Sequence, residues 1–395
     1  MGRMVTRPDT GGCPVNLDAD GVWRIRGHAA ARAVLRSADT AQGGLGVETM
    51  RKMPSRIRRP VLYRDGPEHR EHRRQTARFF TARRVDEQYR DLMRDVAEAQ
   101  LAVLRRDGRA HLADLGFELA IGVTSAVIGL TESRPGIRGR LERFFPEEFD
   151  SPGFTSLTGL KWVWRQARNW SAIYFRDVRP AVRARRRERR DDLISHLLDE
   201  GCSGAEILGE CITFAAAGMV TTREFVNLAA WHLLTDEELR RHYLAAAEPD
   251  RLELLQEILR LEPVIGRLRR RTTDSVDIPG DEAIPGGALV ELVIDDANAD
   301  PAEVGDEPLE LRPGREIASG AAGLSFGDGP HKCPGAHIAI LEADVFLHRL
   351  LTSPVRMESP PRVSFNDAIN GYELRGLVVA LESGSPPTGR GPTTS

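Results

Sequence analysis

The longest mostly apolar stretch of the chain runs from Ser203 to Thr235, near its middle. A helix of roughly thirty residues spans about 45 Å, which is enough to cross a large domain. Both ends of the stretch are too polar, and its interior is too interrupted, for a membrane span. We therefore predict one long helix here, in which the small residues 215–218 would let a flat ligand approach closely.

Amphipathic patterns elsewhere predict helices over 86–106, 112–130, 236–246 and 336–351, and a strand followed by a helix over 23–37. Short apolar runs at 276–280 and 288–294 are typical of strands. The segment 42–59, rich in Gly, Met, Pro and Arg, is expected to be a loop. Together these patterns predict a mainly α fold with a minor β part.

The length of 395 residues would allow two or three domains. However, residues 21–382 contain no linker, repeat or break in composition, so we expect a single domain there. Residues 1–20 are expected to be a flexible N-terminus and 383–395 a disordered tail, because both ends are polar and rich in Pro and Gly.

The net charge is −3, and we find no basic stripe with interleaved aromatic residues in the sequence. Nucleic-acid binding is therefore not expected. The N-terminal twenty residues lack the apolar region of a signal peptide, so we expect a soluble, cytoplasmic protein without a membrane anchor. The four cysteines, Cys13, Cys202, Cys211 and Cys333, show no spacing typical of a metal site.

The segment with the most specific chemistry is the decapeptide 326–335, Phe-Gly-Asp-Gly-Pro-His-Lys-Cys-Pro-Gly. Its glycines let the backbone wrap closely around a flat group, and Pro334 suits the first turn of the helix that follows. A thiolate of Cys333 at this helix N-terminus would be favoured by the helix dipole. Such a loop fits an axial thiolate on haem iron, although a buried structural cysteine in a Gly-rich turn is the alternative.

This decapeptide resembles the haem-binding loop of the cytochrome P450 family, Phe-Gly-x-Gly-x-His-x-Cys-x-Gly. Every fixed position of the pattern is filled here, by Phe326, Gly327, Gly329, His331, Cys333 and Gly335. The resemblance extends from about Trp23 to Leu381, and it implies the P450 fold, haem b as cofactor with Cys333 as axial ligand, and dioxygen as co-substrate.

A second family feature is Glu257-x-x-Arg260, whose side chains share a helix face. In the family this pair is locked to an arginine downstream and supports the thiolate loop. The resemblance makes Arg312 the candidate for that arginine.

Residues that would bind the haem propionates are also implied by the resemblance. His69 and Arg73 lie four apart in a segment similar to the start of the family's C-helix. Arg271 and His331 would add further contacts, since a guanidinium pairs well with a carboxylate.

The long central helix resembles the family's oxygen-binding I-helix, with Ala217 and Gly218 facing the haem and Thr221 at the position of the family's threonine. A threonine bonded backward to a helical carbonyl can distort the helix and hold water. The preceding residue is normally an acid that relays protons, but here it is Val220. Thr222 could assist the relay, and Glu224, four residues after Val220, could replace the acid or simply pair with a basic neighbour.

The missing acid leaves two reactions open. The first is ordinary oxygen insertion into a small hydrophobic or aromatic specialised metabolite. The second is oxidative C–C or C–N coupling without oxygen insertion. A third, different reading is a non-catalytic haem-binding module, against which Cys333, Thr221 and the Glu257–Arg260 pair all argue.

The resemblance also implies a substrate pocket and partners. The pocket would be bordered by Val220, Val264, Ile265 and Tyr372, with a lid formed by 138–187 that is rich in Trp and Phe. No flavin or iron–sulfur sequence is present, so electrons are expected from a ferredoxin and an NAD(P)H-ferredoxin reductase.

Overall fold

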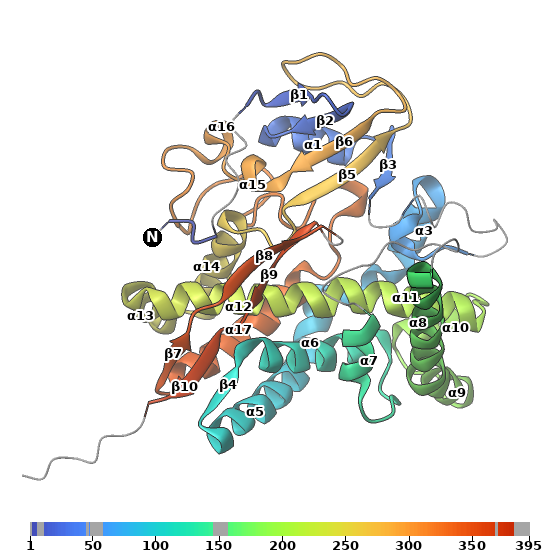
Figure 1. Cartoon of the computed structure of the whole chain (residues 1–395), viewed down its shortest axis with the longest axis vertical. Helices are drawn as coiled ribbons and strands as arrows, with labels where there is room; N and C mark the ends of the chain where they lie inside the picture. The colour runs from blue at the N-terminus through green and yellow to red at the C-terminus, as the bar shows by residue number, and fades with distance from the viewer. Residues whose placement is uncertain are drawn as a thin grey trace, which may run out of the picture.

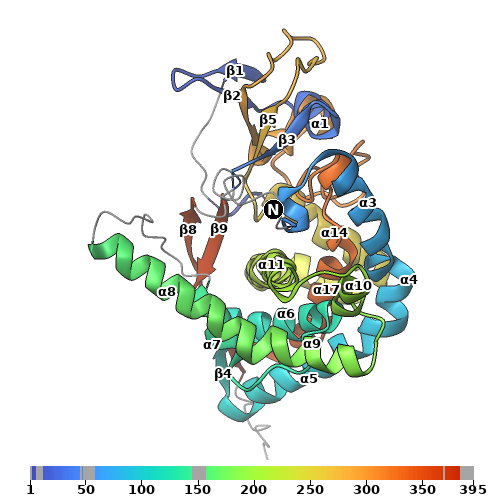
Figure 2. The same ribbon diagram turned by 90° about the vertical axis from the view of Figure 1, so that its right-hand side faces the viewer.

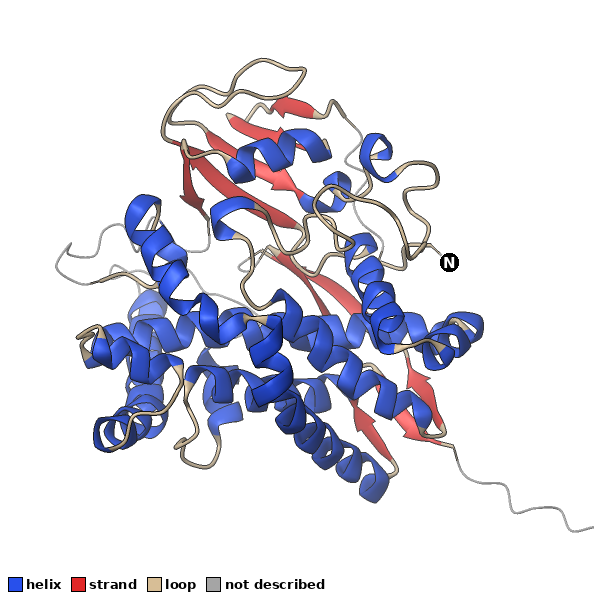
Figure 3. Ribbon diagram, turned by 180° about the vertical axis from the view of Figure 1, so that it is seen from behind, coloured by secondary structure: helices blue, strands red, loops and turns tan. Residues whose placement is uncertain are grey.

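The computed structural model describes residues 2–5, 12–44, 47, 58–144, 157–367 and 370–382, without the side chains of 157–160 and 162. The expected disordered tail, most of the loop 42–59 and the middle of the lid lie outside these ranges. The described part is mainly helical, with small sheets at its edges (Figures 1 and 3). The predicted fold class is therefore confirmed.

The central helix runs through the whole molecule as three consecutive pieces, α11 (Gly204–Ala215), the π-helical turn η5 (Ala216–Val220) and α12 (Thr221–Thr235). Ser203 and Glu206 form a reciprocal capping box that fixes its start. Its length and apolar character would suffice for a membrane span. In the fold it packs against α6, α14 and α17 instead, with Phe225, Val226 and Leu228 in the largest core cluster.

The other helices surround this axis, with α5 and α6 on one side and the larger sheet on the other (Figure 1). The helices of at least seven residues are α1 (His28–Arg36), α3 (Gly66–Thr76), α5 (Arg90–Asp107), α6 (Leu112–Ile128), α7 (Ile137–Phe144), α8 (Leu157–Ile173), α9 (Arg179–Arg187), α10 (Leu193–Asp199), α13 (Glu237–Ala245), α14 (Glu248–Leu261) and α17 (Ala336–Thr352). Shorter ones are α4 (Ala82–Arg84), α15 (Ile294–Ala297) and α16 (Pro301–Val304).

The β part has three pieces. The largest sheet has the order β1 (Val15–Leu17), β2 (Val22–Ile25), β6 (Leu289–Val293), β5 (Arg267–Thr272) and β3 (Thr40–Gly43). A second sheet joins β4 (Arg109–His111), β10 (Val378–Leu381) and β7 (Val355–Ser359). The third is the hairpin of β8 (Arg362–Asn366) and β9 (Gly371–Arg375).

One local expectation is wrong: residues 276–280 form no strand but only a single bridge between Val276 and Ile284. The helix predicted over 336–351 is confirmed, since α17 runs from Ala336 to Thr352. Within the N-terminal segment 1–20, Arg3 donates hydrogen bonds to the carbonyls of Leu261 and Asp295, both at 3.0 Å.

Candidate active site

The cysteine loop connects the sheet region to the N-terminus of α17. The Cys333 N–H donates to the Phe326 carbonyl at 2.8 Å, which closes the loop. Gly327 and Gly329 both have positive φ, of 66° and 64°. A Cβ atom at Gly329 would lie 2.3 Å from the Leu35 carbonyl oxygen, so only glycine fits where the loop crosses the end of α1.

The thiol of Cys333 experiences opposing influences. The residue as a whole reaches the surface, whereas the thiol lies among enough protein atoms for burial to raise its pKa. A hydrogen bond from the Gly335 N–H and the charge of Arg73 act in the opposite direction and favour the thiolate. Arg73 is held over the loop by its hydrogen bond to the Lys332 carbonyl.

Two histidines from separate elements meet beside this loop. The rings of His69, on α3, and His331 stack with centroids 3.9 Å apart, and the His331 Nε2 lies 3.0 Å from the Asp65 carboxylate. Burial, together with the charges of His331 and Arg73, lowers the pKa of His69 to about 3. The His69 ring is therefore neutral at pH 7 and can approach its partner without charge repulsion.

The arginine at this cluster is Arg270 and not the expected Arg271. In strand β5 alternate side chains point to opposite faces, and Arg270 is buried whereas Arg271 is partly exposed and donates to the Gly287 carbonyl at 3.0 Å. Burial lowers the pKa of Arg270 to about 10, and Asp65 raises it. Arg271, which the sequence suggested for this role, lies one residue further along the strand and therefore on the opposite face.

The cluster therefore has more positive than negative charge. Among the described residues, neither Arg73 nor Arg270 forms an ion pair, and the single hydrogen bond of the Arg270 guanidinium goes to the neighbouring Arg269 carbonyl at 2.8 Å. A buried guanidinium without a carboxylate is costly. Two propionate groups placed here would supply the missing negative charge, so these residues fit haem.

The Glu-x-x-Arg pair lies behind the loop. Arg260, fully buried, donates two hydrogen bonds to Glu257 at 2.6 and 2.8 Å. The third member is Arg315, whose Nε lies 3.3 Å from the same carboxylate. The expected Arg312 contributes only its backbone N–H, at 2.9 Å, while its half-exposed side chain pairs with Glu307. The assignment of Arg312 as the third charge is thus wrong.

The central helix is distorted next to Thr221, as predicted from a threonine that bonds backward to a helical carbonyl. The Thr221 hydroxyl donates to the Ala217 carbonyl at 2.6 Å, directly after the π-helical turn. Ala217 is exposed, whereas Val220 is buried. Gly218 faces α6, where a Cβ atom would lie 2.8 Å from the Thr124 hydroxyl. The small residues thus also serve close helix packing.

A buried acid that the sequence interpretation missed lies behind the second threonine. Glu342, on α17, is buried beside the Thr222 side chain, and burial raises its pKa well above the ordinary value although Thr222 acts to lower it. Within the described part of the chain, its Oε2 atom has no hydrogen-bond partner. Glu342 follows Cys333 by nine residues, within an apolar helix, and a charged residue at a core-facing position was the signal that could have revealed it.

Glu224 has a different role from the substitute acid considered above. Its carboxylate is fully buried and accepts the Leu374 N–H at 2.8 Å. It also pairs with Arg223 and Arg375, both at 2.7 Å. The structure favours the alternative in which Glu224 pairs with basic neighbours, because its oxygens are already used by three donors.

Three residues predicted to border the substrate pocket, Val264, Ile265 and Tyr372, make contacts within the core and the β region. Val264 is buried in the main core, and its carbonyl accepts the Tyr372 N–H at 2.9 Å, while Ile265 forms a bridge with Gly371. The Tyr372 hydroxyl lies 3.1 Å from Asp295, and its ring packs edge-on against Phe365. Its side chain therefore belongs to the β region rather than to an open pocket.

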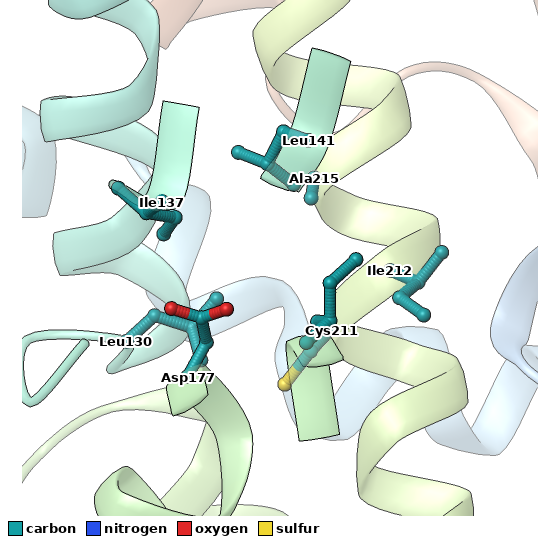
Figure 4. Close-up of a pocket in the computed structure, with 8 residues that line it drawn as sticks. Leu130, Ile137, Leu141, Asp177, Cys211, Ile212 and Ala215 are labelled. Atoms are coloured by element: carbon teal, nitrogen blue, oxygen red, sulfur yellow. The ribbon is translucent and has the colours of Figure 1, made fainter. Parts of the chain in front are cut away.

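A small apolar pocket lies on another face of the central helix (Figure 4). It is lined by Leu130, Ile137, Leu141, Ile173, Asp177, Cys211, Ile212 and Ala215. Burial raises the pKa of the Cys211 thiol, and Asp177 is paired with Arg140. None of these residues belongs to the cysteine loop or to the cluster of Asp65, His69, Arg73, Arg270 and His331. This pocket is therefore separate from the candidate active site.

The described fold and site define a mainly helical protein that presents a single cysteine at a helix start beneath a long distorted helix. The chain belongs to the cytochrome P450 family: the family profile matches residues 253–370. The P450 monooxygenase PikC of Streptomyces venezuelae is 30% identical over 85% of this chain and 78% of its own. The erythromycin C-12 hydroxylase of Saccharopolyspora erythraea is 29% identical over 86% and 83%.

Solved structures agree with this assignment. A mutant of P450 EryK in complex with erythromycin B superimposes with a TM-score of 0.72 at 26% identity, covering 95% of this chain and 94% of that one. CalO2 reaches a TM-score of 0.76 at 24% identity, covering 94% of both chains, and supports the fold. The chain is therefore a cytochrome P450 enzyme, and the monooxygenases PikC and the C-12 hydroxylase are its relatives.

Proposed function

We propose that this P450 is a haem-thiolate monooxygenase that inserts one oxygen atom into a hydrophobic specialised metabolite. The family implies haem, which when bound would supply the redox chemistry of dioxygen. Cys333 would ligate the iron, and His69, Arg73, Arg270 and His331 would hold the propionates. The relatives whose names state a macrolide substrate favour a bulky, largely apolar substrate, although the lid aromatics also suit an aromatic one.

The observation that carries this proposal is the buried carboxyl group of Glu342 beside the buried Thr222. Oxygen insertion consumes two protons and two electrons, and the second oxygen atom leaves as water. Val220 cannot supply a proton, whereas burial raises the pKa of Glu342 well above its ordinary value and so favours the protonated carboxyl. Thr222 connects it to the helix that carries Thr221, whose hydroxyl is positioned by the Ala217 carbonyl.

The second candidate is oxidative coupling, favoured by Val220 at the acid position. In that reaction two substrate hydrogens are lost, a C–C or C–N bond forms, and both oxygen atoms leave as water. The electrons in either case would come from a ferredoxin and its NAD(P)H-dependent reductase, docked near Arg73, Arg74, Arg78 and Lys332.

The test begins with the ferric spin state, titrated against macrolide, terpene, indole and cyclic-dipeptide compounds. The compound that produces a high-spin shift is then turned over with ferredoxin and reductase under ¹⁸O₂. We expect one labelled oxygen atom in the product. A coupled product without label would refute oxygen insertion and establish the second candidate.

A further inference from the structure

The outer face of the lid helices carries an unusual concentration of positive charge. Residues 157–187, which form α8, the π-helical turn η4 (Tyr174–Val178) and α9, contain nine Lys and Arg residues and one acid, Asp177. Asp177 is buried and bound to Arg140 at 2.6 and 2.8 Å. Among the basic residues, Arg185 is buried and paired with Asp192. The exposed basic residues are Lys161, Arg168, Arg176, Arg183, Arg186 and Arg187, so the outer face of these helices is positively charged although the chain as a whole has a net charge of −3.

Two large, exposed aromatic side chains lie among these basic residues. Trp164 is 66% exposed and Phe175 is 52% exposed. The guanidinium of Arg168 lies 5.3 Å from the Trp164 ring centroid, and that of Arg179 lies 5.4 Å from the Phe175 centroid. The structure thus contains a basic stripe with interleaved aromatic residues, which the sequence analysis did not find.

The remaining side chains of α8 explain why these two rings are not simply lid packing. Trp170 packs edge-on against Phe144 of α7, with centroids 5.2 Å apart, and Asn169 donates to the Arg143 carbonyl at 2.8 Å. These contacts hold α8 against α7, although Trp170 remains 39% exposed. Trp164 and Phe175 are more exposed than Trp170, and Trp and Arg are among the residues most enriched in protein-binding hot spots.

The position of α8 argues against the electron donor as the partner of this stripe. In Figure 2, α8 extends to one side of α11, and α3, which carries Arg73 beside the cysteine loop, lies on the other. An electron donor must approach the cysteine side. The other molecule that a P450 must receive is its substrate, and the lid is on the side where the substrate would enter.

We propose that this stripe, defined by Lys161, Trp164, Arg168, Phe175, Arg179 and Arg183, docks an acidic protein domain that carries the substrate. This inference rests on the proposed function. Because the stripe is positively charged, a partner surface rich in carboxylates would be complementary to it. The aromatic rings of the stripe would add apolar contacts to that partner. An anionic membrane fits less well, because the stripe exposes two rings among many charges and no continuous apolar face.

The test measures binding to the haem-loaded enzyme without turnover, using an acyl carrier protein as a small acidic probe. We expect binding in low salt that weakens as salt rises. Trp164→Ala and Arg168→Glu should each weaken it at least tenfold, whereas Arg241→Glu, an exposed position on the distant α13, should leave it unchanged. Thermal melting of each variant checks that the fold is intact.

The proposal is overturned if the carrier protein does not bind, or binds the stripe variants as tightly as the wild type. It is also overturned if phosphatidylglycerol vesicles or a 20-nucleotide DNA strand bind in its place with the same dependence on Trp164 and Arg168. Because no oxidation is measured, failure here is separate from failure of the proposed function, which labelled turnover of a free substrate tests.

Discussion

The carboxylate of Glu224 accepts the backbone N–H of Leu374 at 2.8 Å, although the two residues are 150 positions apart. This contact joins strand β9 to the central helix, about one turn after Thr221. Arg375, next in the strand, adds an ion pair at 2.7 Å. The acid of this helix therefore anchors strand β9, and with it the β8–β9 pairing, relative to Thr221.

Replacement of Glu224 by Gln should loosen this hairpin. The amide can still accept the Leu374 N–H, but the guanidinium of Arg375 loses its 2.7 Å ion pair and keeps only the longer one with Glu373 at 3.4 Å. The loss should destabilise the hairpin by about 1–3 kcal/mol. We expect faster hydrogen exchange of the amides in β8 and β9. Glu200→Gln, at an exposed position after α10, provides a control for the charge change, and equal protection of the hairpin in wild type and Glu224→Gln would contradict the anchoring role.

The Glu257 network predicts a contrast between two nearby arginines. Arg315 is buried, contacts Glu257 and donates to the Val304 and Glu307 carbonyls at 2.6 and 2.8 Å. Arg315→Ala should therefore lower the free energy of unfolding by about 3 kcal/mol and weaken haem retention. Arg312→Ala removes only surface ion pairs, for which about 0–1 kcal/mol is expected. Denaturant unfolding of both variants, with the haem absorbance as a second readout, checks this order.

The same comparison shows what the sequence could and could not predict. The cysteine loop, the central helix and the position of Thr221 follow from local patterns, namely glycine spacing, apolar periodicity and a backward hydrogen bond. The third arginine does not, because Arg312 and Arg315 lie in an irregular segment with no periodicity to rank them. Only the tertiary contacts of the folded chain decide which one reaches Glu257.

Strand register explains why Arg270, and not Arg271, lies at the His69–His331 cluster. Arg269, Arg270 and Arg271 are consecutive, and the face on which each lies depends on how β5 pairs with β3 and β6. A register shift of one residue exchanges the two faces, and these partners are separated from β5 by long stretches of sequence. The buried Glu342 was missed for a different reason, since an acid in an apolar helix attracts attention only once its buried neighbour, Thr222, is known.

The axial ligand and the proton path predict separate spectroscopic and kinetic signatures. Cys333→Ser should abolish the red-shifted carbon monoxide spectrum of a thiolate-ligated haem, and a retained band would contradict the ligand assignment. Glu342→Gln should keep that spectrum, since the thiol is unchanged, but should convert more of the consumed NAD(P)H into peroxide. The ratio of product to NAD(P)H measures this, and tight coupling in Glu342→Gln would exclude the carboxyl as the proton source.

Glu210, a buried acid in the α11 part of the central helix, predicts how the stability of the fold depends on pH. Glu210 lies 3.0 Å from Arg64 and accepts the Val61 N–H at 3.1 Å, and it thus ties the segment before α3 to α11. Burial nevertheless raises its pKa from 4.5 to about 7. The folded protein therefore retains a proton that the unfolded chain has lost, so the contribution of Glu210 to stability decreases as pH rises from about 4.5 to about 7.

His72 has the opposite effect on stability. Burial and the charge of Arg64 lower its pKa in the folded protein to about 4. As pH falls, the unfolded chain therefore binds the proton before the folded protein does, and the stability decreases. The two effects are separated by comparing the melting temperatures of wild type and Glu210→Gln at each pH. The wild type should gain most relative to this variant near pH 5, and the gain should shrink by pH 7.5. Glu200→Gln, exposed at the end of α10, should give a difference that does not change with pH, and a constant difference for Glu210→Gln as well would show that this carboxyl is ionised throughout.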